Sequence, residues 1–369
     1  YIFVSSLIVY MKREELLHIL HQFEINNSDN LISENAIKLC EVKGSQVSLT
    51  IAVSNPSLQF KNKVRDEVKK QILNKFSDAV ISINFIMDDN TDSNASPKII
   101  NTIAVASGKG GVGKSTIASN LAIALKNKGY AVGLIDADIY GPSIPLMFDA
   151  EYERPKSIKK GNKTLMSPIV SYGIKIMSIG FFSNPSDAII WRGPMATKAL
   201  NEIINQTDWG NLDYLLIDLP PGTGDVHLSI VQTLSLTGSI IVTTPQTVSL
   251  IDAKKAINMF KKKDINVPIV GVVENMSWLL VDNNKHYIFG KDGGVALSES
   301  ENIPLLIQLP LDQSIREAGD VGRPAALQQS ILANIFHQLA EKLDISIENR
   351  NKELPPTKKV QITHNRGCN

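Results

Sequence analysis

The sequence predicts an α/β protein: a mostly parallel sheet with helices on both faces, preceded by a small α+β domain. From residue 99 onward, continuous apolar runs alternate with segments of helical periodicity, as buried parallel strands and their crossover helices require. Before residue 88, a hairpin signal and amphipathic helices replace this alternation. The chain has 369 residues, enough for about two domains.

The composition is that of an ordinary globular protein. Hydrophobic residues make up 43% and charged residues 20% of the chain, which is enough apolar material for a sizeable core. The net charge of +1 gives no overall field that favours nucleic acid or an acidic membrane surface. Two cysteines cannot form a disulfide framework and suit a reducing cytosol. We therefore expect a cytoplasmic protein with no membrane and no nucleic-acid partner.

The small α+β domain is expected over residues 11–87. A helix over residues 14–22 leads to two alternating runs around Gly44, which predict a hairpin. A second helix repeats Val64, Val68, Ile72 and Phe76 at every fourth position, and the strand-like run "VISINFIM" follows. The polar residues 88–98 predict a linker. The preceding residues 1–10 are too short for a membrane span and lack a basic leader, so we expect translation to start at Met11.

The second domain is expected over residues 99–345. The helix predicted for residues 114–126 carries Ile117, Leu121 and Leu125 on one stripe, and Gly129 suits its C-terminal cap. A last helix is expected over residues 325–343, and residues 346–369 read as a polar tail. The strands are predicted at residues 102–107, 131–136, 214–218, 239–244, 269–274 and 305–308.

The stretch "GKGGVGKST" is the strongest functional signal. It lies between a predicted strand and a predicted helix and fits the phosphate-binding loop G-x-x-x-x-G-K-[ST]. Glycines let backbone N–H groups converge on phosphate oxygens at a helix N-terminus. We expect Lys114 to reach the β- and γ-phosphates and the Ser115 hydroxyl to bind Mg²⁺. The nucleotide-binding residues would be Gly108, Lys109, Gly110, Gly111, Val112, Gly113, Lys114, Ser115 and Thr116.

Aspartates follow two other predicted strands. The carboxyl ends of parallel strands face the ligand crevice, and "LIDADIYGPS" and "LLIDLPPGTGD" place acidic groups there. Asp218 fits a carboxylate in the second coordination shell of Mg²⁺, and the backbone amide of Gly222 is placed to sense the γ-phosphate. Asp138 is placed to orient the attacking water or a water bound to Mg²⁺.

These motifs together resemble a known class. "GKGGVGKST" is similar to the deviant Walker A motif of the MinD/ParA/nitrogenase-iron-protein class of P-loop ATPases. "DADIYGPSIP", "WRGPM", "DLPPGTGD" and "GVVENMS" resemble the Mrp/ApbC family of ATP-binding iron–sulfur cluster carriers, over roughly residues 99–345. The N-terminal unit resembles the MIP18-like domain that often precedes this ATPase. The resemblance implies slow ATP hydrolysis coupled to cluster delivery, with apoprotein clients and iron–sulfur assembly proteins as partners.

The resemblance also assigns the second lysine of the loop. In this class the extra lysine reaches across a two-fold interface to the nucleotide of the other subunit. Lys109 would therefore act in trans as a catalytic residue beside Lys114 and Asp138, in an ATP-bound homodimer. Asn275 matches the asparagine that reads the adenine edge in relatives.

One family feature is missing. Many members carry a C-x-x-C after the segment matching "ENMS", and cysteines from two subunits hold one [4Fe–4S] cluster. Here that segment reads "WLLVDNNKHYIFGKDGG" and contains no cysteine. Only Cys40, in an apolar run, and Cys368, in the tail, remain as thiolate ligands. Cys368 is the candidate cluster ligand, because free cysteines in apolar runs are usually buried.

Two other functions stay open. The first is an ATP-dependent scaffold without a cluster of its own. The second is a positioning ATPase like MinD or ParA, for which the sequence offers little support. The tail "KVQITHNRGCN" has no apolar face for a membrane. The basic stretch "KKAINMFKKKD" is the only candidate for a DNA-binding stripe, and we interpret it as a solvated helix face.

Overall fold

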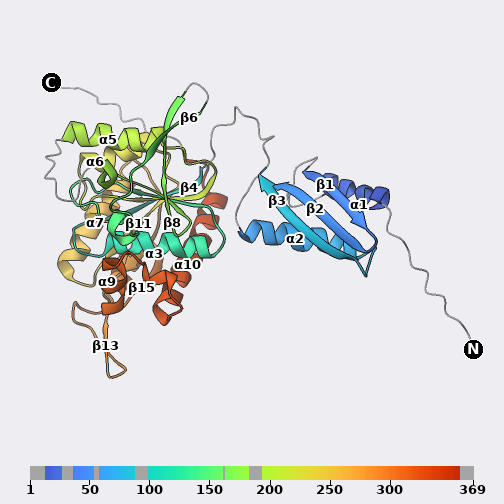
Figure 1. Cartoon of the computed structure of the whole chain (residues 1–369). Coiled ribbons are helices and arrows are strands. Elements are labelled where there is room, and N and C mark those ends of the chain that lie inside the picture. The colour runs from blue at the N-terminus through green and yellow to red at the C-terminus, as the bar shows by residue number, and fades with distance from the viewer. Residues whose placement is uncertain are drawn as a thin grey trace, which may run out of the picture. The chain divides into compact units, whose positions relative to one another are not determined.

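A computed structural model of the chain describes residues 13–26, 36–53, 58–87, 99–160, 163–182 and 193–357 (Figure 1). The chain divides into two compact units, Tyr1–Ser96 and Pro97–Asn369. Residues 1–10, the whole predicted linker of residues 88–98, and Cys368 lie outside the described ranges.

The N-terminal unit is a three-stranded sheet with two helices. Its elements are α1 (Arg13–Asn26), β1 (Ile37–Lys43), β2 (Gln46–Val53), α2 (Leu58–Leu73) and β3 (Val80–Met87). The predicted hairpin is confirmed, since β1 and β2 pair antiparallel around Gly44 at φ +63°, while β3 pairs parallel to β2. Val64, Val68 and Ile72 on α2 are fully buried against this sheet. The alternation along β2 therefore points every second residue at the helices.

The second unit contains an eight-stranded sheet in the order β15-β12-β11-β4-β10-β5-β9-β8. All neighbours pair parallel except β8, which runs antiparallel to β9 at the edge. The strands of this sheet are β4 (Ile99–Ser107), β5 (Val132–Asp136), β8 (Ile169–Ser171), β9 (Ile174–Ser178), β10 (Leu212–Asp218), β11 (Gly238–Thr243), β12 (Ile269–Glu274) and β15 (Leu305–Gln308). The predicted mostly parallel sheet is thus confirmed.

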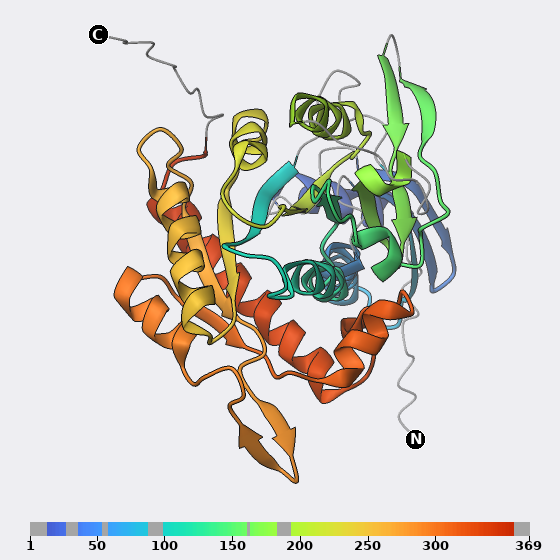
Figure 2. The same cartoon turned by 90° about the vertical axis from the view of Figure 1, so that its left-hand side faces the viewer.

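Helices cover both faces of this sheet (Figure 1, Figure 2). One core cluster includes residues of α3 and α10, and the other includes residues of α5, α6, α7 and α8. Successive residues of β4 face opposite clusters, with Val105 in one and Ala106 in the other. The helices are α3 (Lys114–Asn127), α4 (Ile144–Met147), α5 (Gly193–Gln206), α6 (Asp225–Thr233), α7 (Thr247–Lys261), α8 (Gly293–Glu301), α9 (Gln313–Asp320) and α10 (Ile331–Glu353).

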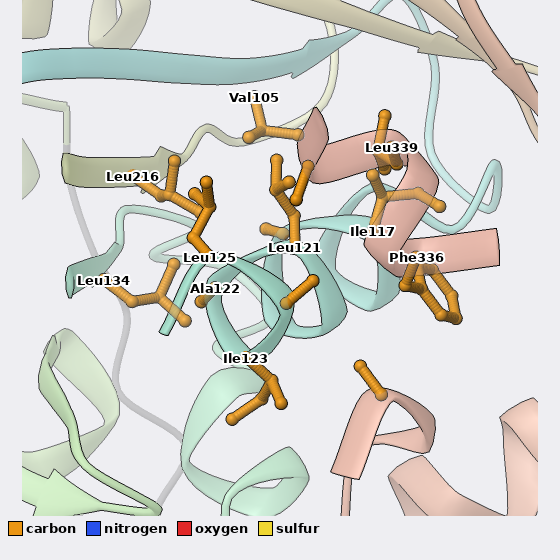
Figure 3. Close-up of a cluster of buried hydrophobic side chains, with 14 of the residues drawn as sticks. Val105, Ile117, Leu121, Ala122, Ile123, Leu125, Leu134, Leu216, Phe336 and Leu339 are labelled. Atoms are coloured by element: carbon orange, nitrogen blue, oxygen red, sulfur yellow. The ribbon is translucent and has the colours of Figure 1, made fainter. Parts of the chain in front are cut away.

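Helix α3 holds the phosphate-binding loop against the sheet. The predicted stripe of Ile117, Leu121 and Leu125 is buried, with each residue at most 1% exposed. It packs with Phe336 and Leu339 of α10 (Figure 3). The helix ends as predicted: Gly129, at φ +97°, follows its last turn. The start of α3, and with it the loop, is therefore fixed by a continuous hydrophobic core.

The structure also contains strands that the sequence patterns did not predict. Two short antiparallel hairpins, β6 (Lys156–Lys160) with β7 (Lys163–Ser167) and β13 (Leu279–Val281) with β14 (Asn284–His286), lie outside the main sheet. Strands β8 and β9 extend the main sheet beyond β5. These runs are only three to five residues long, too short to show a clear period.

The C-terminal helix differs from its prediction at both ends. A 3₁₀ turn occupies Ala325–Leu327, and α10 then begins at Ile331 and continues to Glu353. The prediction of a polar tail from residue 346 was therefore wrong for its first residues. The polar residues there are helical because Leu343, Ile347 and Arg350 continue the buried stripe. Among the helices of the described ranges, none has the length and hydropathy needed to cross a bilayer.

Candidate nucleotide site

The loop of residues 108–113 leaves the carboxyl end of β4 and enters α3. Gly111 and Gly113 adopt left-handed backbone angles, with φ of +80° and +85°. Residues that carry a Cβ rarely adopt such angles. A Cβ on Gly108 would lie 2.0 Å from the backbone carbon of Asp252 on α7. The sequence places glycines here because the loop must turn sharply and pack against a neighbouring helix.

Lys114 lies at the centre of the site. It is only 6% exposed, and its Nζ donates to Oδ1 of Asp218 at 2.7 Å and to Oγ of Ser115 at 3.3 Å. Oδ2 of Asp138 lies 4.0 Å from the same nitrogen. The structure thus brings together residues that the sequence predicted from three separate motifs.

Asp218 ends β10 and is fully buried. Burial raises the pKa of its carboxyl group, and the charge of Lys114 partly opposes this rise. Its Oδ2 atom is buried and has no hydrogen-bond partner among the described residues. A buried carboxylate oxygen that lacks a donor is suited to a water held by Mg²⁺, so the residues present fit the metal that this motif implies.

Asp136 is a site residue whose role the sequence did not reveal. It lies next to Asp218 in the register of β5 and β10, and it is fully buried. Burial and then the charge of Asp218 raise the pKa of Asp136 to about 7. Its Oδ1 accepts from the backbone N–H of Asp138 at 3.1 Å. Asp136 therefore fixes the backbone that carries Asp138.

Lys109 and Gly222 flank the loop. The Nζ of Lys109 donates to Oε1 of Gln246, the residue before α7, at 3.3 Å. The Gly222 N–H donates to the carbonyl oxygen of Ser107 at 3.0 Å, and Gly222 has a φ of +91°. The amide predicted to sense the γ-phosphate thus lies against the strand that leads into the loop.

Asn275, which follows β12, contacts the same loop. Its Nδ2 donates to the carbonyl oxygen of the buried Val112 at 2.9 Å, and a Cβ on Gly113 would lie 2.2 Å from that nitrogen. This bond uses one of the two N–H groups of the amide. The neighbouring Met276 has a φ of +56°, a strained angle of the kind found at ligand sites.

A cavity of about 240 Å³ adjoins the loop on this side. Its apolar walls come from α4, α9 and the segment after β15, which suits a flat aromatic base with a polar edge. Its lining residues are Gly113, Thr116, Leu146, Met147, Asn275, Met276, Pro310, Leu311, Asp312, Ile315, Arg316, Gly319 and Asp320.

His227 is a buried titratable group close to this machinery. It lies in the first turns of α6 and is only 1% exposed. Burial, followed by the charge of Lys114, lowers the pKa of His227 to about 4, so the imidazole is neutral at pH 7. A histidine directly after "DLPPGTGDV" was the available sequence signal, and the sequence reasoning did not use it.

The cysteine-free segment that follows "ENMS" forms the β13–β14 hairpin, which stands clear of the rest of its unit (Figure 2). Its base is tied to the cavity wall, since the Leu311 N–H donates to the carbonyl oxygen of Trp278 at 2.7 Å. Lys285 lies over the ring of Trp278 at 3.7 Å. No cluster of His, Cys, Asp or Glu suited to a metal ion occurs within the described ranges.

Neither cysteine is among the described residues that form this site. Cys40 is buried on β1 of the N-terminal unit, at 4% exposure. Cys368, the candidate cluster ligand, lies beyond the last described residue.

Three of the five lysines in the basic stretch of residues 254–264 form ion pairs. Lys254 and Lys261 both form ion pairs with Glu301 at 2.9 Å, and Lys255 pairs with Asp252 at 3.0 Å. Cations that are engaged in this way are poor candidates for a stripe that contacts phosphates.

Comparison with known proteins agrees with this geometry. Residues 98–344 match a family model described as "ParA: NUBPL iron-transfer P-loop NTPase". The sequence is 39% identical to the iron-sulfur cluster carrier protein of Haemophilus influenzae, across 91% of this chain and 92% of that protein. It is 45% identical to the iron-sulfur cluster carrier protein of Aquifex aeolicus, across 69% of this chain and 70% of that protein.

Solved structures show the same fold. A nucleotide-binding protein from Archaeoglobus fulgidus in complex with ADP is 35% identical, with a TM-score of 0.54 over 62% of this chain and 89% of that chain. The septum site-determining protein MinD from Pyrococcus horikoshii, complexed with Mg-ADP, is 25% identical, with a TM-score of 0.51 over 69% of this chain and 100% of that chain. The predicted resemblance and fold class are confirmed.

Proposed function

Since the chain belongs to the ParA family of NUBPL iron-transfer P-loop NTPases, we propose that it binds and hydrolyses ATP in order to deliver iron–sulfur clusters to apoproteins. The observation that carries this proposal is the buried contact of Lys114 with Asp218 at the entrance to α3. Relatives named as iron-sulfur cluster carrier proteins support the choice of cargo.

Phosphate binding would rest on the loop and Lys114. The N–H groups of residues 110–115 line the start of α3, where the helix dipole favours an anion. Lys114 would exchange its contact with Asp218 for the β- and γ-phosphates. Ser115 would bind Mg²⁺ directly, and Asp218 would hold one of its waters; the bound metal would neutralise phosphate charge.

Hydrolysis would depend on Asp138 and Gly222. Burial raises the pKa of Asp138, and Lys114 opposes this rise. A carboxylate beside the phosphate site can orient the attacking water. The Gly222 amide would sense the γ-phosphate by leaving the Ser107 carbonyl, so hydrolysis could reset the loop after β10. The base would occupy the 240 Å³ cavity beside Asn275.

We infer that the active form is a homodimer. Within one chain, the Nζ of Lys109 donates to Gln246, and its recorded contact is therefore outside the phosphate site formed by Lys114 and Asp218. A lysine that is not committed to its own phosphate site can supply charge to the site of a second copy. Closure of two such sites on ATP would link nucleotide state to cargo release.

The cargo would be held by few ligands from this chain. A cluster needs thiolates, Cys40 is buried, and the hairpin segment contains no cysteine. Cys368 from two subunits would supply two ligands, and the client would complete the set. A site completed by the client suits transfer better than storage.

Anaerobic reconstitution with iron and sulfide tests this proposal. Wild type, Cys368→Ser and Cys40→Ser are compared by metal analysis and by thiolate-to-iron absorbance, with and without an apoprotein client. We expect cluster loss only in Cys368→Ser, whereas loss only in Cys40→Ser would move the site to the N-terminal unit. Wild type that takes up no cluster even beside a client would leave an ATP-driven scaffold as the function.

A further inference from the structure

Ser178 is the last residue of β9 and lies opposite Asp136 in the register of β5 and β9. It is fully buried. Its hydroxyl donates to Oδ2 of Asp136 at 3.0 Å, and its Oγ accepts from the N–H of Gly180 at 3.0 Å. This one side chain therefore joins the end of β9 to the carboxylate that ends β5.

The carboxylate of Asp136 holds the next loop at both ends. Its Oδ1 accepts from the N–H of Asp138 at 3.1 Å, and its Oδ2 accepts from the N–H of Ile144, where α4 begins, at 3.2 Å. Hydrogen bonds in a buried, low-dielectric setting are stronger than those in water, and they polarise one another. The position of the loop between these residues thus depends on how Asp136 is oriented.

The segment after β9 also touches this loop directly. A Cβ on Gly180 would lie 3.2 Å from side-chain atoms of both Pro142 and Pro145. That spacing is tighter than ordinary van der Waals contact, so Gly180 packs closely against the loop from the side of β9. Two independent contacts, one polar and one steric, therefore connect β9 to the segment that carries Asp138.

We propose that Ser178 is a positioning residue for ATP hydrolysis, acting through Asp136 to hold Asp138 in place. The inference rests on the proposed function, in which Asp138 orients the attacking water. Ser178 lies on the far side of Asp136 from Lys114 and the phosphate loop, and it contacts neither in the described structure. It should therefore affect the chemical step and leave nucleotide affinity unchanged.

Loss of the hydroxyl would leave Oδ2 of Asp136 with only the Ile144 N–H as a donor. The carboxylate can then rotate, and the Asp138 backbone moves with it. Displacements of about 1 Å at a reacting centre can lower a rate by about a hundredfold. We expect Ser178→Ala to lower kcat about tenfold, because the Ile144 bond remains.

A double-mutant cycle tests the inference. Single-turnover ATP hydrolysis and the Kd for ADP are measured for wild type, Ser178→Ala, Asp138→Asn and the double variant of the full chain. Ser178→Ala should slow hydrolysis about tenfold with Kd within about twofold, and it should have no further effect in the Asp138→Asn background. Ser178→Thr, which keeps the hydroxyl, should restore most of the rate.

Ser239→Ala is the matched control. Ser239 is equally buried in β11 of the same sheet, and its Oγ donates to the Pro268 carbonyl oxygen at 3.4 Å, away from Asp136. It should match Ser178→Ala in melting temperature and wild type in kcat. A similar slowing in Ser239→Ala would show a general packing effect and overturn the inference.

Two further outcomes separate the inference from the proposed function. If Asp138→Asn slows hydrolysis but Ser178→Ala has the wild-type rate, the inference alone is overturned. The same holds if Ser178→Ala slows hydrolysis by the same factor in the wild-type and Asp138→Asn backgrounds. A wild-type rate in Asp138→Asn would overturn both the role of Asp138 and the role assigned to Ser178.

Discussion

The loop of residues 108–113 and the segment of residues 275–293 leave the same edge of one sheet, yet they are built in opposite ways. The first enters α3 through glycines and ends at Lys114, which is buried and bonded to Asp218. The second extends into a hairpin whose Leu280 and Val281 are 55% and 43% exposed. The difference indicates that nucleotide handling is fixed in the buried edge of the sheet, whereas the hairpin segment contains no thiolate with which to hold a cluster.

The largest expected difference between the two regions is in how much a truncated side chain lowers the free energy of unfolding. Phe336→Ala should lower the free energy of unfolding by about 3–5 kcal/mol, because Phe336 is fully buried against α3 (Figure 3). Leu280→Ala on the hairpin should cost about 0.5 kcal/mol or less, since that side chain is half exposed. Denaturant unfolding of the two variants measures the difference. Equal losses would mean that the hairpin is part of the core.

Lys114→Ala should lower ATP affinity about a hundredfold or more, because the phosphates lose the buried cation of the loop. Equilibrium dialysis with labelled nucleotide measures the loss. Lys254→Ala is the control, since it removes a lysine that only pairs with Glu301. Near-wild-type affinity in Lys114→Ala would refute this placement of the nucleotide.

Lys109→Ala should behave differently from Lys114→Ala. Binding should stay within about twofold of wild type, while hydrolysis falls about a hundredfold, as expected for a cation supplied in trans. Dimer formation with ATP, followed by light scattering, should also be lost. Gln246→Ala removes the partner of Lys109 but keeps the lysine, so it should still hydrolyse ATP. Normal turnover in Lys109→Ala would exclude the trans role.

The smallest expected effect is on acid stability. The folded pKa of His227, about 4, lies below the unfolded value of about 6.5. Its stabilising effect is therefore complete above pH 6.5 and is lost as the pH falls toward 4, by about 2 kcal/mol between pH 7 and pH 5. His227→Asn should remove this loss in thermal unfolding across that range. The raised pKa of Asp136 has the opposite effect on stability, but Asp136 is present in both wild type and His227→Asn, so its contribution cancels in the comparison. If His227→Asn lost as much stability as wild type between pH 7 and pH 5, the buried neutral state assigned to His227 would be contradicted.

Local chemistry explains which parts of the site were predictable. The glycines of the loop, Lys114 and Asp218 follow from spacing and from their places at strand ends. The partnership of Asp136 with Ser178 depends on β9 lying beside β5, and β9 is a five-residue strand near the sheet edge that no period reveals. The bond from Asn275 to Val112 spans 163 positions. Contacts of that kind are set by topology rather than by neighbouring residues.

ATP-dependent cluster transfer tests the central claim most directly. Reconstituted protein is mixed anaerobically with an apo-ferredoxin, and cluster arrival is followed by absorbance with ATP, with a non-hydrolysable analogue and without nucleotide. We predict that ATP accelerates transfer by wild type, while Lys114→Ala transfers at one slow rate under all three conditions. Equal acceleration in Lys114→Ala, or no transfer by wild type, would contradict an ATP-driven carrier.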